Sequence, residues 1–165
     1  MLIHWIWFAT RAGMGDKMKS VLLSHFEDPE AIYFAPELEF ERVEDLSPAA
    51  VESIMDKDLT PCEEILQQCQ DKGIHILTVQ DAAYPNRLKN IPDPPMVLYY
   101  RGTLPAFDEF PVIGVVGTRQ ASLYGMTAAK RLGYQIAACG GTVVSGMARG
   151  IDTCAHEGAL KGEGP

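Results

Sequence analysis

The chain has 165 residues, 47% of which are apolar, and a formal net charge of −8. This length fits one domain, or a small domain followed by part of another, and the apolar fraction is typical of a globular protein with a hydrophobic core. No stretch reaches the roughly 18 to 20 apolar residues of a membrane-spanning helix, so we expect no membrane association.

The acidic charge is concentrated in the first part of the chain. Residues 1–110 carry 9 basic and 19 acidic side chains, a balance of −10, whereas residues 111–165 carry 5 and 3, a balance of +2. This distribution excludes a broad basic surface but leaves room for a local phosphate site in the second part. The four cysteines form no C-x-x-C pair and the four histidines are scattered, so we expect no metal ion, no cofactor, and reduced thiols in a cytoplasmic protein.

Residues 1–72 are predicted to form a small domain of short helices. The apolar opening, residues 2–8, has no preceding basic residue and no following cleavage site, which favours a core helix over a signal peptide. Gly13-Met14-Gly15 resembles the glycine turn of a helix-hairpin-helix or SAM-like domain, which can bind DNA phosphate. A plain connection is the favoured interpretation, because Asp16 and the acidic surroundings oppose an anion. The acidic helices are also candidates for a protein-binding face.

Several side chains of this part have the position of helix caps. Asp28 and Ser47 are each followed by proline, which is typical of the first helical turn. Asp16 precedes another apolar stripe and is also predicted to cap a helix. Thr60, with Glu63 three residues later, fits the capping box.

The predicted secondary structure changes from helices to strands after Gly73, which is expected to end the last of these helices. Residues 74–79 and 96–100 are predicted strands, separated by a loop with one helical turn near Arg87. Two further β-branched runs, at 112–116 and 142–144, are predicted to be buried parallel strands.

A helix is predicted over residues 122–139, between these two strands, and another after residue 150. The stripe of the first helix expected to face inward consists of Ala128, Leu132 and Ile136. The predicted fold class is therefore α/β, with a Rossmann-like, mostly parallel sheet preceded by a small all-helical domain. The predicted domains are 1–72 and 73–165.

Each of the two parallel strands runs into a glycine-rich turn that holds an arginine and opens a helix. The backbone N–H groups at a helix start point outward, and the helix dipole favours an anion there. Glycine lets the backbone approach closely, and arginine supplies a forked donor that matches phosphate oxygens. Two such turns at the ends of neighbouring strands face one crevice, which we predict grips a nucleic-acid backbone. The residues expected to line it are Gly117, Thr118, Arg119, Gly125, Ser145, Gly146, Ala148, Arg149 and Gly150.

The common nucleotide-binding motifs do not fit these turns. A dinucleotide fingerprint needs G-x-G-x-x-G and an acid closing the second strand, and a P-loop needs Gly-Lys-Ser/Thr. Here the first turn reads G-V-V-G-T-R from Gly114. Thr118 and Ser145 are expected to donate hydroxyl hydrogen bonds, and Arg119 and Arg149 charge-assisted ones.

Three neighbouring side chains have two interpretations each. Asp152 and His156 lie four residues apart on one predicted helix face, as a general acid/base pair would. The favoured interpretation is a helix cap at Asp152 with a supporting polar residue. Tyr124 is either a stacking platform for a base or an anchor for the helix start.

These motifs resemble the DNA-processing protein A family, DprA/Smf. The first, V-I-G-V-V-G-T-R-x5-G, begins at Val112, and the second, T-V-V-S-G-M-A-R-G-I-D-x3-H-x-G-A-L, begins at Thr142. The segment from Tyr84-Pro85 to Pro94-Pro95 is also similar to that family. The resemblance is strong over residues 73–162, and before that it is one of layout only.

The resemblance implies a function. The family binds single-stranded DNA in the cytoplasm, protects it, and loads a RecA-type recombinase during natural transformation, commonly as a homodimer. By motif, Gly117, Thr118 and Arg119 would meet backbone phosphate, and residues 145–150 would form the second wall of the site. Asp152 and His156 would support the following helix, and no catalytic residue is implied.

The sequence departs from the family at its end. It stops at residue 165, after the second strand–helix unit, whereas the family's sheet continues with more strands, a further basic residue and most of the dimer surface. We therefore expect an incomplete sheet with an exposed strand edge.

Two alternatives to single-strand binding remain open. One is a Rossmann-like hydrolase of nucleotide phosphates, which would use the same turns together with His156 and would release base from nucleoside monophosphates. The other is a protein-interaction module formed by the acidic helices of residues 1–72.

Overall fold

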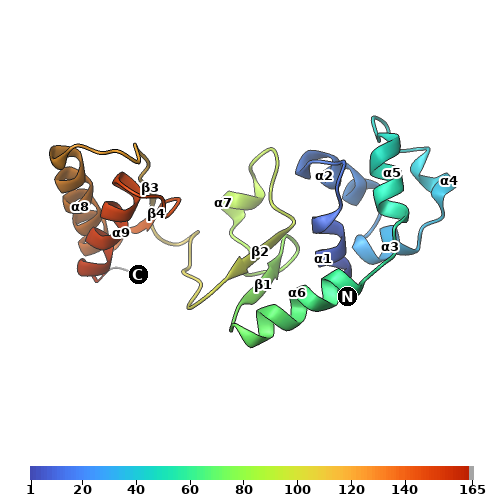
Figure 1. The fold of residues 1–165 in the computed structure, drawn as a ribbon, viewed down its shortest axis with the longest axis horizontal. Coiled ribbons are helices and arrows are strands. Elements are labelled where there is room, and N and C mark those ends of the chain that lie inside the picture. The colour runs from blue at the N-terminus through green and yellow to red at the C-terminus, as the bar shows by residue number, and fades with distance from the viewer. Residues whose placement is uncertain (164–165) are drawn as a thin grey trace. The chain divides into compact units, whose positions relative to one another are not determined.

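The computed structural model describes residues 1–163 and forms two compact units, 1–104 and 105–165 (Figure 1). Residues 164 and 165 lie outside the described part. The expectation of an incomplete sheet concerned this end of the chain. The predicted α/β class is confirmed, because helices and strands alternate around a small parallel strand pair. No helix within 1–163 combines the length and apolarity that crossing a bilayer requires.

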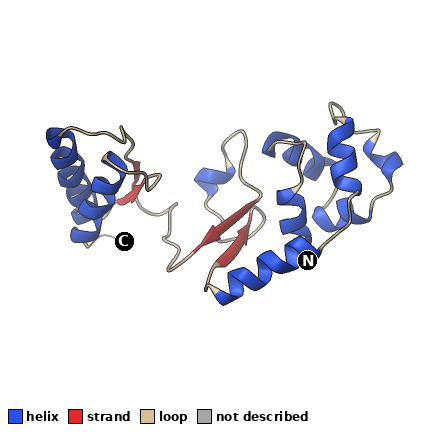
Figure 2. Cartoon of the chain, viewed as in Figure 1, coloured by secondary structure: helices blue, strands red, loops and turns tan. Residues whose placement is uncertain are grey.

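The first unit consists mainly of helices, with one strand pair (Figure 2). Its elements are α1 (Leu2–Thr10), α2 (Asp16–His25), α3 (Pro29–Phe34), α4 (Glu37–Phe40), α5 (Pro48–Met55), α6 (Thr60–Asp71), β1 (His75–Thr78), α7 (Asn86–Lys89) and β2 (Val97–Tyr100). Both strands and the helical turn near Arg87 were predicted, and the strands pair antiparallel from His75 opposite Tyr100 to Thr78 opposite Val97. Because this strand pair belongs to the same compact unit as the helices, the unit ends later than residue 72. The domain boundary at 72 stays a prediction.

Helix α1 lies at the centre of the first unit's core. Its residues are apolar almost all round the helix, a pattern typical of a buried helix. Ile6, Trp7 and Phe8 are completely buried, and the Trp7 indole N–H donates to the Asp56 carbonyl at 2.9 Å, after the end of α5. The predicted core helix is confirmed.

In the first unit, two of the predicted helix caps are present and two are not. Asp28 accepts from the Ala31 N–H at 2.8 Å, and Ser47 accepts from the Ala50 N–H at 3.2 Å. Asp16 and Thr60 instead lie inside their helices, whose N-caps, Gly15 and Leu59, make no side-chain cap hydrogen bond. The capping box at Thr60 was wrong because the Asp58 carboxylate accepts the Thr60 N–H at 2.9 Å, so the helix begins one residue earlier.

The Gly13 turn is packed against another helix. Gly13 has φ of +77°, and a Cβ there would lie 3.2 Å from backbone atoms of Ala49 and Ala50 at the start of α5. The turn therefore has a structural reason for glycine, which supports the plain connection between α1 and α2.

The second unit contains β3 (Val112–Gly114), α8 (Leu123–Ala138), β4 (Thr142–Val144) and α9 (Ile151–Lys161). The two helices cross on small residues: a Cβ at Gly133 would lie 3.2 Å from the Ala155 Cα, and one at Gly158 would lie 2.9 Å from the Tyr134 nitrogen. The stripe of α8 that faces inward is accordingly Ala129, Gly133 and Ala137. The predicted stripe was wrong by one position: Leu132 is 52% exposed, because only small side chains allow α9 to approach so closely.

Candidate nucleic-acid interface

The parallel strands bring the two glycine-rich turns to the same edge of the sheet. Val112, Ile113 and Gly114 lie opposite Thr142, Val143 and Val144, and the Val115 N–H extends the ladder by donating to the Val144 carbonyl at 3.0 Å. In parallel strands both carboxyl ends lie at one edge. The turn at 115–122 and the turn at 145–150 therefore start side by side, as the sequence predicted.

Two hydrogen bonds connect the turns directly. The Ser145 hydroxyl donates to the Val115 carbonyl at 2.6 Å, and the Ile151 N–H donates to the Thr118 carbonyl at 3.3 Å. The Ser145 proton is thus used within the protein, so Ser145 holds the turns together in this structure. Its predicted contact with phosphate stays a prediction.

Two glycines, Gly117 and Gly150, make close contacts where the turns meet. A Cβ at Gly117 would lie 2.6 to 2.9 Å from side-chain carbons of Ile151, and one at Gly125 would lie 3.4 Å from the Ile151 Cδ1. Gly150 has φ of +86°, and a Cβ there would lie 2.9 Å from the Arg119 carbonyl oxygen. Ile151 was not singled out from the sequence. Its sequence signal is its place directly after Gly150, and the first turn packs against its side chain.

The remaining donors of the turns are available to a ligand. Thr118 Oγ1 accepts from the Gln120 N–H at 3.1 Å, which orients the hydroxyl and leaves its own proton free to donate. Arg119 and Arg149 are both exposed, and within residues 1–163 neither forms an ion pair with a carboxylate. The site therefore offers two unpaired guanidinium groups and a hydroxyl.

The second turn has a constrained backbone at its tip. Met147 has φ of +56°, a region that side chains rarely adopt, and it is 82% exposed. The Ala148 carbonyl accepts from the Thr153 N–H and hydroxyl, at 3.1 and 2.6 Å. A Cβ at Gly146 would lie 3.1 Å from the Asp152 Oδ2. The two hydrogen bonds from Thr153 attach the second turn to the start of α9.

Asp152 does not cap α9, contrary to the prediction. The helix begins at Ile151 with Gly150 as its N-cap and no side-chain cap hydrogen bond. Asp152 lies in the first turn, only 6% exposed, where its charge is favourable to the helix dipole. The His156 Nε2 is buried without a hydrogen-bond partner, and among the described residues no hydrogen bond joins His156 to Asp152. It lines a cavity of about 240 Å³ together with Thr142, whose buried hydroxyl is also unpartnered.

An ion pair connects the two helices of the second unit away from the turns. Lys130 on α8 and Glu157 on α9 form an ion pair at 2.7 Å. Their hydrogen bond raises the pKa of Lys130 and lowers the pKa of Glu157. Among residues 1–163, no three His, Cys, Asp or Glu side chains are grouped as a metal site would require.

The fold and the turns define a Rossmann-like α/β unit with two adjoining glycine–arginine turns. Residues 75–165 match the model of the DNA recombination-mediator protein A family. The chain therefore belongs to this family, which confirms the predicted resemblance.

Individual relatives agree with this assignment. The chain is 32% identical to Protein Smf of Synechocystis sp., over 98% of this chain and 42% of that protein. It is 30% identical to DNA processing protein DprA of Bacillus subtilis, over 88% of this chain and 49% of that protein. The crystal structure of DprA from Streptococcus pneumoniae superposes with a TM-score of 0.75 at 25% identity, covering 99% of this chain and 56% of that one. The chain thus spans about half the length of the relatives it matches.

Proposed function

We propose that this chain binds the phosphate backbone of single-stranded DNA between the two glycine turns. The observation that carries the proposal is the direct connection of the turns, by the Ser145–Val115 and Ile151–Thr118 hydrogen bonds, with Arg119 and Arg149 exposed and unpaired beside them. Two exposed, unpaired guanidinium groups on adjoining turns are suited to phosphate oxygens.

The charge distribution supports this location. Residues 111–165 carry 5 basic and 3 acidic side chains, whereas residues 1–110 carry 9 and 19. A polyanion is repelled by the acidic part and is attracted by the turns of the second unit. We therefore expect DNA to contact only a few basic side chains, all of them near the two turns.

Exposed apolar side chains beside the turns favour a single strand over a duplex. Tyr124, in the first turn of α8, is 84% exposed, and Met147 is 82% exposed. Unpaired bases stack on aromatic side chains at about 1–3 kcal/mol per base, whereas a duplex keeps its bases in the stack. In this proposal Tyr124 contacts a base while the arginines hold phosphate.

A role in recombination follows from the family. Its description as a recombination mediator, and the relatives described as DNA processing proteins, support a protein that protects a cytoplasmic single strand and transfers it to a RecA-type recombinase. We extend this role, and homodimerisation, to the present chain as part of the proposal.

The test is a titration of labelled oligo-dT followed by fluorescence polarisation. Arg119→Ala and Arg149→Ala are each expected to weaken binding by about tenfold, the loss typical of a charge-assisted contact. Arg131→Ala is the matched control, because Arg131 is exposed on α8 outside both turns. The logarithm of the affinity should fall by about 0.7 per contacted phosphate for each decade of salt.

Equal losses of DNA affinity for Arg119→Ala, Arg149→Ala and the control Arg131→Ala would indicate a diffuse charge effect. That result would contradict the proposed site. Release of free base from nucleoside monophosphates would replace the binding proposal by the hydrolase alternative.

A further inference from the structure

Helix α5 has two apolar stripes, and only one is fully buried. Ala50 and Ile54, four residues apart, are 1% and 0% exposed. Pro48, Val51 and Met55 form a second stripe at spacings of three and four residues, which places them on a different side of the helix. This second stripe lines a groove instead of being enclosed.

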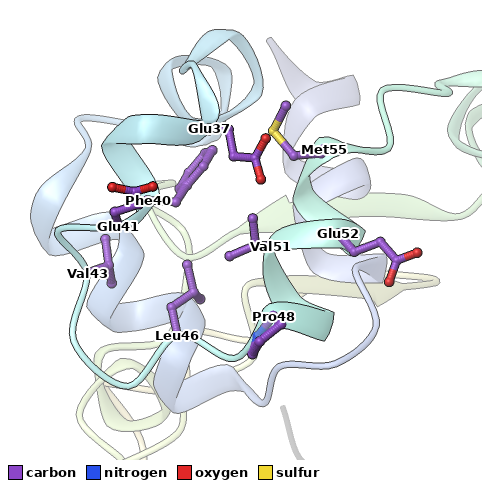
Figure 3. A pocket seen from close by; sticks show the side chains of 9 residues that line it. All are labelled: Glu37, Phe40, Glu41, Val43, Leu46, Pro48, Val51, Glu52 and Met55. Carbon is purple, nitrogen blue, oxygen red and sulfur yellow. The ribbon is translucent and has the colours of Figure 1, made fainter.

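The groove lies between α4, α5 and the loop that connects them (Figure 3). Its volume is about 550 Å³. Phe40 and Val43, which are 1% and 6% exposed, and the partly buried Leu46 line it opposite the α5 stripe. Such an apolar floor on a fixed helical framework can accept apolar side chains of a ligand.

Carboxylates surround this apolar floor. Glu37 and Glu41 come from the α4 side and Glu52 from α5, and all three line the groove and are exposed (Figure 3). None of the three forms an ion pair within residues 1–163. The groove therefore has three acidic groups free to pair with a ligand.

The surrounding segment strengthens the negative charge. Residues 37–58 contain eight acidic side chains and two basic ones, Arg42 and Lys57. The Lys57 ammonium does not reach the groove's solvent, because its Nζ is buried at 5.2 Å from the Trp7 ring and 5.1 Å from the Tyr33 ring. The negative electrostatic potential at the groove mouth thus favours a positively charged ligand.

We propose that this groove binds a basic amphipathic helix of a partner protein. Such a helix places apolar anchors at spacings of three, four and seven residues against a groove floor, and its flanking lysines or arginines meet acidic groups at the rim. The same rim repels nucleic acid. The inference is independent of the DNA proposal, since it concerns only α4, α5 and their loop.

The test uses designed peptides and the full chain. The probe is a fluorescein-labelled helical peptide of 18 residues with leucines at one face and lysines at its margins. A scrambled peptide of the same composition and a version with glutamate in place of lysine are the controls. The probe is expected to bind, and both control peptides are expected to bind about tenfold more weakly or not at all.

Substitutions in the protein locate the binding surface. Glu41→Lys is expected to lower the affinity for the probe about fivefold, as is typical when an exposed ion pair is lost and charge repulsion is added. Glu44→Lys changes the same charge in the same loop outside the groove and should leave the affinity unchanged. Met55→Ser removes an apolar contact from a side chain that is 37% exposed, so an unaltered thermal melt will verify folding. The Glu37→Lys/Glu41→Lys double variant should bind the glutamate peptide better than the wild type does.

Three outcomes would overturn the proposal: equal binding of the scrambled peptide, equal losses for Glu41→Lys and Glu44→Lys, or self-association of the chain that Met55→Ser abolishes. The last would assign the groove to a second copy of this chain. Arg119→Ala is expected to leave the peptide affinity unchanged, whatever its effect on DNA binding. This result separates the groove from the glycine turns.

Discussion

At the scale of single residues, the glycines of the two turns have a packing role that is independent of any ligand. Gly117 makes room for Ile151, and Gly150 makes room for the carbonyl of Arg119. From the sequence, these glycines were read only as positions where phosphate approaches. Their contacts mean that replacing them will disturb the turns themselves, whereas the arginines are the residues that report on a ligand.

Gly150→Ala is expected to destabilise the protein more than Gly140→Ala. Both glycines have positive φ, at +86° and +79°, so both substitutions incur backbone strain of about 1–3 kcal/mol. Only at Gly150 would the new Cβ also collide with the first turn, because nothing lies within 4 Å at Gly140. Urea unfolding of the two variants measures the difference, and equal losses would show that the turns do not adjoin.

Arg119→Ala and Arg149→Ala are expected to leave the fold intact. Both side chains are exposed and, among the residues that the structure describes, unpaired. Surface substitutions of this kind change the free energy of unfolding by less than about 0.5 kcal/mol. A thermal melt checks this, and a marked loss of stability would mean that the arginines hold the turns together and would remove their value as probes of DNA.

At the scale of elements, the α8–α9 crossing explains why the predicted inward stripe was displaced by one residue. Helix periodicity places Leu132 on a plausible apolar face, but the partner helix approaches too closely for leucine. The contact is made by glycine and alanine, whose sequence signal is weak because these residues contribute little to an apolar pattern. Which stripe of α8 is buried therefore depends on how closely α9 packs against it.

Gly158→Ala is expected to destabilise the protein by about 1–3 kcal/mol through overpacking, although alanine has the higher helix propensity. The new Cβ would lie 2.8 Å from the Lys130 carbonyl carbon. Gly125→Ala, where the nearest atom is 3.4 Å away, serves as the control and should be neutral or slightly stabilising. Chemical denaturation will measure both, and stabilisation by Gly158→Ala would rule out the close crossing.

The start of α6 should make stability dependent on pH. Hydrogen bonds from the Thr60 hydroxyl and N–H lower the pKa of Asp58 below its ordinary value of 3.8. A depressed folded-state pKa means that the stabilisation is complete above the ordinary value and is lost as the pH falls through the folded-state pKa.

Asp58→Asn should therefore lower the free energy of unfolding at neutral pH, with a difference from the wild type that shrinks in the acid range below 3.8. Asp93→Asn, at an exposed loop position, is the control and should show no such trend. A difference between wild type and Asp58→Asn that is constant with pH would contradict the role of the carboxylate.

At the scale of the whole molecule, the first unit contains a complete hydrophobic core. The core cluster extends from Trp5 to Met96, and its members from the strand region include Leu77, Val79 and Tyr84. A fragment of residues 1–104 is thus expected to unfold cooperatively, as judged by circular dichroism with urea.

A fragment of residues 1–72 lacks these strand-region side chains and should be less stable than residues 1–104. This comparison also tests the domain boundary predicted at residue 72. Equal stability of the two fragments would support that boundary and would show that β1 and β2 contribute little to the core.

The sequence by itself determined where most helices and strands lie, and it determined the family. Proline after a capping residue marked the starts of α3 and α5, β-branched runs marked the strands, and the long motif from Thr142 identified the family. These signals depend on residues close together in the chain, so they survive without knowledge of the fold. The tertiary structure decided what depends on partners in other elements: the packing of the first turn against Ile151, the burial of Asp152, the inward stripe of α8 and the acidic groove beside α5. Each of these requires contact between side chains of different elements, and no pattern within a single element specifies that contact.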